Sequence, residues 1–318
     1  MASPQTSRIP EKTATVALIA AFAAIYFIWG STFLAIRFAV ETMPPLVMMG
    51  TRHLVAGALL LGWIFFVRRE SRPEPQLWLH ALIAGAFCFL GCHGLLAWAE
   101  IRIDSGLAAL LSSTLPIWMV LLARARGQER ELTPRILTGI FLGLLGVAVL
   151  IPFKFTASQR ADWIAALAII VCELLWAAGA IYSRGVKTAT PATTFAAMQM
   201  ICGGSLLWIV GTLFGETSHI SAATFTPKSV LSLAFLIVFG SLVTFTAYTW
   251  LLKVSSPAIV STHSYVNPVV AVVLGWFLAD EHVTSRTLAG AAIVLGSVFL
   301  ISRKKEAEVL EPEFEAAD

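Results

Sequence analysis

The feature that most constrains this chain is a series of long apolar runs separated by short charged connectors. An α-helix needs about 20 apolar residues to cross the hydrocarbon core of a bilayer. Ten segments meet this requirement: residues 15–36, 46–67, 77–98, 104–123, 134–152, 162–183, 192–214, 229–252, 257–279 and 285–302. Since lipid offers the backbone no hydrogen bonds, such segments must be helical. We therefore predict an all-α polytopic membrane protein with ten transmembrane helices.

The overall composition excludes a soluble domain. The chain is 58% hydrophobic and 13% charged, whereas soluble domains carry about 25% charged residues. Its net charge of +3 is too small to indicate a nucleic-acid partner. The first apolar run is long enough to span and many more follow it, so we expect it to remain as a helix rather than be removed as a signal peptide.

The distribution of Lys and Arg predicts the orientation. With the N-terminus inside, the inner segments hold fifteen of the 22 basic residues, the outer segments hold six, and Arg52 lies within a span. Because Lys and Arg are enriched on the cytoplasmic side, both termini are predicted to be cytoplasmic. Residues 1–14 then form a cytoplasmic N-terminus, residues 153–161 a periplasmic linker, and residues 303–318 a solvated acidic tail.

The sequence repeats itself. A shift of 147 positions places Trp29 on Trp176, Arg37 on Arg184, Pro44 on Pro191 and Gly57 on Gly204. A shift of 151–152 then places Arg102 on Lys253, Ser105 on Ser256, Pro116 on Pro268 and Gly139 on Gly290. The chain is predicted to consist of two five-helix repeats, residues 15–152 and 162–302. Because five is odd, the second repeat enters from the opposite face, which is a common scaffold of alternating-access transporters.

Four stretches carry a resemblance to a known family: "IWGSTF", "PPLVMMGTRHLVAG", "AEIRIDSGLAAL" and "VSSPAIVSTHSYVNPVVAVVLGW". They resemble the EamA family of the drug/metabolite transporter superfamily, and most closely its YedA-like branch. The resemblance extends from about residue 16 to residue 302. It implies a ten-helix carrier of the bacterial inner membrane that commonly exports metabolites, amino acids or drugs. It does not imply a particular substrate.

Glu173 is the most distinctive single residue. It lies ten residues after Trp163, or about 15 Å along a helix, near the middle of a hydrocarbon core about 30 Å thick. A carboxylate at that depth is costly and usually functional. One interpretation is a proton carrier; the other is a permanently neutral or hydrogen-bonded acid. Its repeat partner is Tyr26, which is not an acid.

Two aromatic–polar pairs occupy equivalent helix faces in the two repeats. Tyr26 and Trp29, like Glu173 and Trp176, are spaced i, i+3 and therefore share a face. This pattern favours the lining of a central substrate cavity, although packing aromatics would look similar.

Pro116 and Pro268 are predicted to break the fourth and ninth helices at matching points. Each leaves unpaired the carbonyl four residues earlier, at Ser112 and Ser264. Irregular backbone at this depth is tolerated where it is packed in protein or lines a wet cavity. We place Ser264, Tyr265 and Asn267 in the predicted cavity for this reason; the alternative is a kink that is satisfied locally.

Three charged residues near the outer ends, Arg37, Arg52 and Glu100, form a possible ion-pair or substrate-anion site. Arg52 is expected either to hold an anionic group of the substrate or to extend outward and pair with Glu41 or Glu100. We favour structural pairing for Arg52; Arg37 and Glu100 share the outer end and are a candidate pair of the same kind. Of the histidines, which are scattered along the chain, only His263 is a candidate.

No metal or cofactor is expected. The four cysteines lie in apolar runs and imply no disulfide framework. Cys88, Cys92 and His93 are spaced closely, but a zinc site usually has a second ligand pair elsewhere in the sequence. Glycines at 139, 143 and 146, partly matched by Gly290 and Gly296, indicate close helix packing.

The leading functional hypothesis is a secondary carrier that exports a small organic molecule, with the proton as the candidate coupling ion. An intramembrane lipid-modifying enzyme is the alternative, but the chain has no HExxH, GxSxG or P-loop motif. A passive channel is a third hypothesis. The expected partners are a small-molecule substrate, membrane lipid and possible protons; the sequence does not indicate an oligomeric state.

Overall fold

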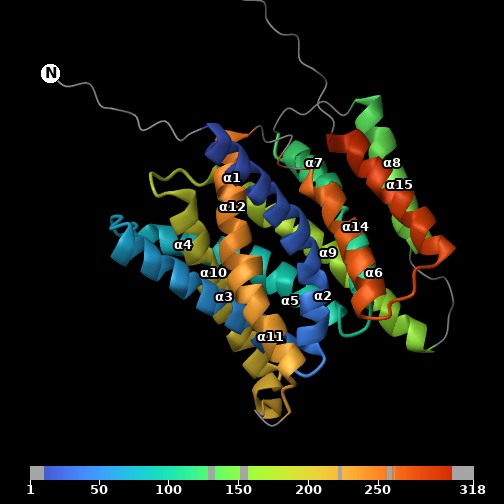
Figure 1. Cartoon of the computed structure of the whole chain (residues 1–318), viewed down its shortest axis with the longest axis horizontal. Helices are drawn as coiled ribbons and strands as arrows, with labels where there is room; N and C mark the ends of the chain where they lie inside the picture. The colour runs from blue at the N-terminus through green and yellow to red at the C-terminus, as the bar shows by residue number, and fades with distance from the viewer. Residues whose placement is uncertain are drawn as a thin grey trace, which may run out of the picture.

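The computed structural model describes residues 11–127, 133–150, 157–220, 224–255, 260 and 262–302. Within them the regular elements are all helical (Figure 1). The elements of the first repeat are α1 (Glu11–Ala23), η1 (Ala24–Ile28), α2 (Trp29–Val40), α3 (Pro45–Gly62), η2 (Trp63–Val67), α4 (Pro75–Gly85), η3 (Ala86–His93), α5 (Gly94–Ala99), α6 (Ser105–Ser112), α7 (Leu115–Ala125) and α8 (Pro134–Leu150). The elements of the second repeat are α9 (Ala157–Gly185), α10 (Ala192–Leu213), η4 (Glu216–His219), α11 (Pro227–Phe235), η5 (Leu236–Val243), α12 (Thr244–Val254), α14 (His263–Leu278) and α15 (Ser285–Ser302).

These elements make up the ten predicted spans in the predicted order. Seven helical stretches are long and apolar enough to cross a membrane. Three shorter apolar helices complete the set: Pro134–Leu150, His263–Leu278 and Ser285–Ile301. The predicted fold class is therefore confirmed. We number the stretches span 1 to span 10. The predicted acidic tail, residues 1–10 of the predicted N-terminal segment and residues 153–156 of the predicted linker lie outside the described residues, whereas residues 157–161 of that linker belong to α9.

Proline sets the starting points of several helices. It is the first residue of α3, α4, α8 and α11. At this position the missing N–H costs nothing, because the first N–H groups of a helix have no partner within it, and the fixed φ already suits the helix.

Spans 5 and 10 pack against each other in opposite directions. Along α8, a side-chain carbon built at Gly139 would meet Ile301, one at Gly143 would meet Ser297, and one at Gly146 would meet Val294. Rising numbers in α8 thus match falling numbers in α15, and the two helices lie side by side at one edge of the molecule (Figure 1). Glycine is required here because the neighbouring helix occupies the space that a Cβ would fill.

Spans 2 and 7 show the same antiparallel relation. Gly57 of α3 lies against Ala197 of α10, and Gly50 lies against Trp208. Spans 2 and 7 are equivalent in the two repeats, as are spans 5 and 10. Equivalent helices that run antiparallel place the two repeats head to tail, which is the inverted arrangement predicted from the odd number of helices.

The ends of α3 and α10 are joined by two equivalent contacts. The carboxylate of Glu216 accepts hydrogen bonds from the backbone N–H groups of Leu46 (3.3 Å) and Val47 (2.9 Å), at the start of α3. At the opposite end, the Glu70 carboxylate accepts a hydrogen bond from Thr194 Oγ1 (2.7 Å), near the start of α10. Val47 matches Thr194 under the shift of 147. In each repeat, a glutamate that follows the second helix thus binds the start of the equivalent helix of the other repeat, Glu216 through backbone N–H groups and Glu70 through a hydroxyl.

The residue before each of these glutamates is left-handed. Arg69 has φ 53° and Gly215 has φ 80°. A third left-handed residue, Asp280 (φ 54°), precedes Glu281. Such a conformation is unfavourable for a residue with a Cβ, and in each case it ends a span and turns the following carboxylate toward the N-terminus of another helix.

Two π-helical segments of eight residues also obey the repeat. The segment η3 (86–93) lies in span 3 and η5 (236–243) lies in span 8, 150 positions later. Because π-helical turns are wide and leave some backbone groups without their usual partners, they are frequent at functional sites. No apolar period in the sequence distinguishes these π-helical segments from ordinary helix, so they were not predicted.

Of the two predicted helix breaks, the structure has one and lacks the other at its predicted position. Span 4 is broken where expected: α6 ends at Ser112, and Pro116 lies in the first turn of α7. Pro268, in contrast, lies inside α14, which is continuous from His263. The prediction of a break at Pro268 is therefore wrong. Nearby carbonyls are satisfied by the Asn267 amide, whose nitrogen, in its favoured orientation, donates to the carbonyl of His263 (3.1 Å).

Candidate functional site

A central cavity of about 350 Å³ lies between the two repeats. Its described lining residues come from spans 1–4 and 6–9, four spans from each repeat, whereas α8 and α15 contribute none. The volume falls within the range of small-molecule sites, which is about 300–1,000 Å³. The inverted repeats therefore enclose a cavity large enough for a small metabolite.

Most of the residues predicted to face a cavity line this one. They are Trp29, Glu173, Trp176, Ser264 and Asn267, together with Arg52 and both prolines, Pro116 and Pro268. Their role in transport stays a prediction, but the fold does bring them together from five different spans.

Tyr26 and Tyr265 were predicted to line the cavity and do not. The Tyr26 hydroxyl is hydrogen-bonded to Thr262 Oγ1 (2.6 Å), and the Tyr265 hydroxyl donates to the carbonyl of Val298 (3.1 Å). Spacing of i, i+3 places Tyr26 near the face of Trp29, but the neighbouring helix covers it. Tyr265 follows Ser264 directly and so points about 100° away around the helix.

Trp29 is held by the second repeat. Its indole Nε1 donates a hydrogen bond to the carbonyl of Gly240 in η5 (3.2 Å). Its ring lies edge-on to His263, with centroids 5.1 Å apart, and is tilted against Tyr248 at 5.2 Å. The predicted cavity indole is thus oriented by a π-helical carbonyl and by two aromatic neighbours.

Glu173 is buried, with 7% of its surface exposed. Its Oε1 accepts a hydrogen bond from Cys172 Sγ at 3.6 Å. The Ser112 hydroxyl lies beside the carboxylate, but it is not in hydrogen-bond geometry with any described residue. Both Glu173 and Ser112 line the cavity, so the carboxylate has few fixed partners and is available to a ligand.

A histidine pair was missed by the sequence analysis. His93 Nδ1 and His53 Nε2 are 2.8 Å apart, and one ring must donate while the other accepts. The two rings stack at 4.9 Å, and His93 also stacks on Trp176 at 5.2 Å. Forty residues separate the histidines in sequence, and no spacing rule connects spans 2 and 3. Both rings line the cavity.

Arg52 does not make the ion pairs that we favoured. Its Nε donates to Ser241 Oγ in η5 (3.0 Å), whereas Glu41 binds Lys228. Glu100 is fully buried, and neither of its carboxylate oxygens has a hydrogen-bond partner among the described residues. The prediction of outward pairing is wrong because Arg52 lies too deep, within the cavity wall.

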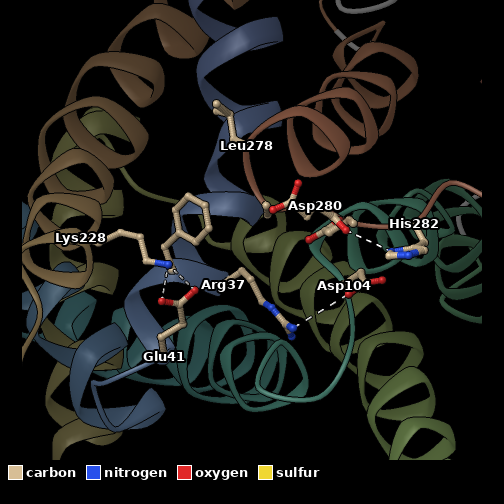
Figure 2. A pocket seen from close by; sticks show the side chains of 10 residues that line it. Arg37, Glu41, Asp104, Lys228, Leu278, Asp280 and His282 are labelled. Atoms are coloured by element: carbon tan, nitrogen blue, oxygen red, sulfur yellow. Dashed lines mark hydrogen bonds and ion pairs between the residues drawn. The ribbon is translucent and has the colours of Figure 1, made fainter.

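Arg37 lies in a pocket at the end of the bundle that is predicted to face outward (Figure 2). Its Nη1 donates to the carbonyls of Glu100 (2.7 Å) and Ile103 (2.8 Å), and Nη2 lies 3.9 Å from Asp104 Oδ1. The predicted pair of Arg37 with the Glu100 side chain is therefore wrong, since the guanidinium binds the backbone at the end of span 3 instead. The bonds tie span 1 to the span 3–span 4 connection.

Two further contacts join spans at the same end. Lys228 forms an ion pair with Glu41 and lies 4.4 Å from the centre of the Phe38 ring (Figure 2). Glu281 accepts hydrogen bonds from Ser105 N (2.8 Å), Ser105 Oγ (2.7 Å) and Gly106 N (3.0 Å), which caps α6.

Burial, together with the charge of Glu281, raises the pKa of the nearby Asp104 carboxyl. The contacts of Arg37, Lys228 and Glu281 together join spans 1, 3, 4, 8 and 9 at this end.

The repeat partner of Arg37 is not engaged. Arg184 is exposed and forms no hydrogen bond or ion pair with any residue that the structure describes. The positions equivalent to Glu100 and Ile103 are Leu251 and Val254, whose backbone is described. The Arg37 contact is therefore formed and the equivalent Arg184 contact is not.

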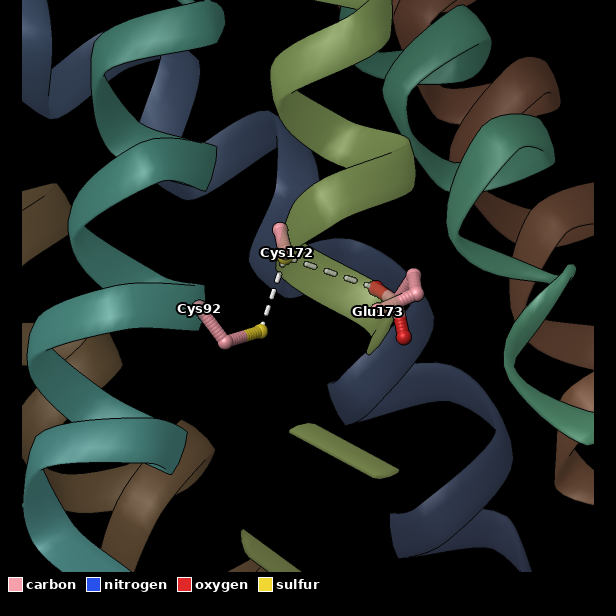
Figure 3. Close-up of side chains that lie close together, drawn as sticks. All are labelled: Cys92, Cys172 and Glu173. Carbon is pink, nitrogen blue, oxygen red and sulfur yellow. Dashed lines mark hydrogen bonds between the residues drawn. The ribbon is translucent and has the colours of Figure 1, made fainter. Parts of the chain in front are cut away.

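Two thiols and a carboxylate meet beside the cavity (Figure 3). Cys92 Sγ lies 2.8 Å from Cys172 Sγ, and ligand atoms of these cysteines and of Glu173 all lie within 4.8 Å of one another. No metal was expected, because Cys88, Cys92 and His93 lack an evident second ligand pair in the sequence; Cys172 and Glu173 lie about 80 residues from Cys92. Packing supplies the second ligand pair that the spacing lacks.

Comparisons with known proteins agree with this architecture. The model of the EamA-like transporter family matches the chain twice, at residues 15–151 and 163–303. An inner membrane transporter of Escherichia coli K12, the uncharacterized protein YedA, is 32% identical over 293 residues, which is 91% of each chain. A probable amino-acid metabolite efflux pump of the same organism is 26% identical and covers 87% of this chain and 91% of that one.

A solved crystal structure shares the fold. It is 21% identical, has a TM-score of 0.61, and covers 90% of this chain and 96% of the other. Since the family model matches both repeats and a relative is 32% identical along 91% of the chain, the protein belongs to the EamA-like transporter family and is a multi-pass membrane transporter.

Proposed function

We propose that the protein exports a small organic metabolite, an amino acid or related compound or a drug-like molecule, through the central cavity. The observation that carries the proposal is the presence of buried Arg52 and Glu173 in one cavity, neither of them ion-paired with a described residue. Buried charges are costly unless a partner offsets them. A substrate with a carboxylate and an ammonium group supplies both partners.

The walls of the cavity support the same substrate class. The rings of Trp29, Trp176, Phe89 and Tyr248 all line it, and aromatic faces attract both apolar groups and cations. Relatives whose names describe amino-acid metabolite efflux favour this class of substrate.

Transport is proposed to proceed by alternating access. The contact of Arg37 with span 3 and the absence of the equivalent Arg184 contact support a state that is closed at one end only. In the opposite state, Arg184 is expected to donate to the carbonyls of Leu251 and Val254 while Arg37 is released. Inverted repeats allow this exchange because each repeat can adopt the conformation of the other.

The remaining elements of the proposal concern location and coupling. The protein is proposed to lie in the bacterial inner membrane, as its relative does, with both termini in the cytoplasm. Glu173 is proposed to carry a proton, since it is a buried acid with few fixed partners and faces the site that alternates.

The test is transport by protein reconstituted in liposomes, with a panel of radiolabelled amino acids and related metabolites. Saturable flux that increases with an imposed pH gradient is expected. Glu173→Gln should lose the response to the gradient, whereas Glu74→Gln, an exposed acid outside the cavity, should keep it. Response to the gradient in Glu173→Gln would contradict the proton role.

The same preparation tests the alternatives. Covalent change of the vesicle lipid without flux would favour a lipid-modifying enzyme. Flux that does not saturate with substrate would favour a channel.

A further inference from the structure

We propose that Cys92, Cys172 and Glu173 form a binding site for a thiophilic divalent cation of the zinc class. The site lies beside the substrate cavity and bridges the two repeats, because Cys92 belongs to η3 of span 3 and the other two residues belong to α9 of span 6. Figure 3 shows the two thiols directed toward each other and the carboxylate next to them.

The ligand set and its geometry fit such an ion. Zinc-class ions prefer cysteine sulfur and accept a carboxylate oxygen, at about 2.3 Å and about 2.0–2.2 Å respectively. The three ligand atoms lie within 4.8 Å of one another, so one ion can reach all of them. The thiols, now 2.8 Å apart, need to move apart by about 1 Å, and rotation of either side chain provides this.

The packing of spans 3 and 6 explains why the thiols meet. A Cβ at Gly179 of α9 would collide with Cys88 Sγ, and one at Gly91 of η3 would lie 2.8 Å from Leu175 Cδ1. These two glycines let the helices approach closely. Cys92 lies about one turn from Cys88 and Cys172 about two turns from Gly179, and the same close approach of the two helices places Cys92 against Cys172.

The chemistry of binding involves no oxidation. The cation forms two metal–sulfur bonds, two S–H bonds break, and the two protons leave through the cavity that Cys92 and Glu173 line. With two thiolates and a carboxylate, a divalent cation leaves one negative charge, which the Arg52 cation in the same cavity offsets. A monovalent cation would leave two negative charges, only one of which Arg52 could offset.

The fourth coordination position of the ion has no described protein ligand and faces the cavity, since two of the three ligands line it. Three protein ligands with one open position are typical of zinc sites that exchange a ligand. Water or the transported molecule is expected to occupy that position.

A bound ion should also restrain transport, and this consequence rests on the proposed function. Alternating access requires the repeats to move relative to each other. An ion that links span 3 to span 6 opposes this motion, so the cation is expected to inhibit flux at concentrations that saturate the site.

The experiment is a titration of the purified full-length protein in lipid nanodiscs with Cd²⁺, in a phosphine reductant that keeps the thiols reduced. Thiolate-to-cadmium charge transfer produces an ultraviolet band, and Zn²⁺ should compete for the site without one. One Cd²⁺ per chain is expected. Cys92→Ser and Cys172→Ser should each weaken binding by more than the roughly 10–100-fold that loss of an outer-shell partner costs.

Two cysteines serve as matched controls. Cys88 is buried in the same π-helical segment as Cys92, and Cys202 is half-buried in α10. Cys88→Ser and Cys202→Ser should keep the band and the affinity. Glu173→Gln, which replaces a carboxylate ligand by a neutral amide, should weaken binding by at least the roughly tenfold that loss of an outer-shell partner costs. Thermal unfolding of each variant identifies any that fail to fold.

The outcomes separate the site from its consequence. Absence of a saturable band, or loss of the band in Cys88→Ser but not in folded Cys92→Ser, would overturn the site. Unchanged affinity in Glu173→Gln would remove the carboxylate from it. Binding with unaffected flux would overturn the inhibition alone, whereas absence of flux in metal-free vesicles would count against the proposed function and not against the site.

Discussion

The closure at the Arg37 end depends on a cap that can be removed with one substitution. Glu281 accepts three hydrogen bonds from the start of α6 (Ser105 N at 2.8 Å, Ser105 Oγ at 2.7 Å, Gly106 N at 3.0 Å). A hydrogen bond to a charged group contributes about 1.5–3 kcal/mol. Because water can hydrogen-bond the freed groups at this partly exposed end, part of the lost energy is recovered. We therefore expect Glu281→Ala to destabilise the closed state by about 3 kcal/mol in total.

This cost corresponds to about a 100-fold shift toward the state that is open at this end. The assay measures the rate at which a membrane-impermeant maleimide, added from the predicted outer face, labels Ser113→Cys in the cavity wall. The four native cysteines are first replaced by serine. If opening limits labelling, Glu281→Ala should accelerate it by about 100-fold, and Glu281→Gln, which keeps an acceptor oxygen, by less.

A second variant disturbs the same cap from the other side. A Cβ at Gly275 would collide with the Glu281 carboxylate, so Gly275→Ala should also accelerate labelling. If both variants fold but label at the rate of the parent protein, the cap does not hold this end closed and the reasoning is wrong.

Three further predictions concern other elements. Arg37→Gln should accelerate labelling from the predicted outer face and Arg184→Gln should slow it, because each substitution destabilises the closure of its own end; the same direction of change in both would contradict the paired closures. Gly143→Ala should lower the free energy of unfolding by about 1–3 kcal/mol, measured by thermal unfolding in micelles, because its Cβ would lie 2.7 Å from Ser297 Oγ, whereas Gly296→Ala, with no atom within 4 Å of its Cβ, should leave it unchanged or raise it slightly. Burial raises the pKa of Asp104 above its ordinary 3.8. The folded state therefore holds this proton more tightly than the unfolded state does, and it loses stability as the pH rises from 3.8 through the raised pKa. Asp104→Asn should raise the melting temperature at neutral pH and leave it unchanged below about pH 4, and an equal effect at both pH values would refute this cause.

The sequence by itself determined the membrane class, the ten spans and the repeat. These properties depend on the length of apolar runs and on the positions of a few matched residues, such as Trp29 and Trp176, which are local features of the chain. The inverted arrangement followed from counting, because an odd number of helices per repeat reverses the second one. Glu173 was recognised from its depth in one helix, a property that needs no neighbour.

Only the tertiary structure decided which residues meet across helices. His53 and His93 are 40 residues apart, and Cys92 and Cys172 are 80 apart, so no helical period relates them. Their contacts depend on how closely the helices approach. A period of 3.6 residues predicts which side chains share a face, but not which neighbour that face meets. Tyr265, placed in the cavity by its sequence position, therefore points toward the carbonyl of Val298 instead.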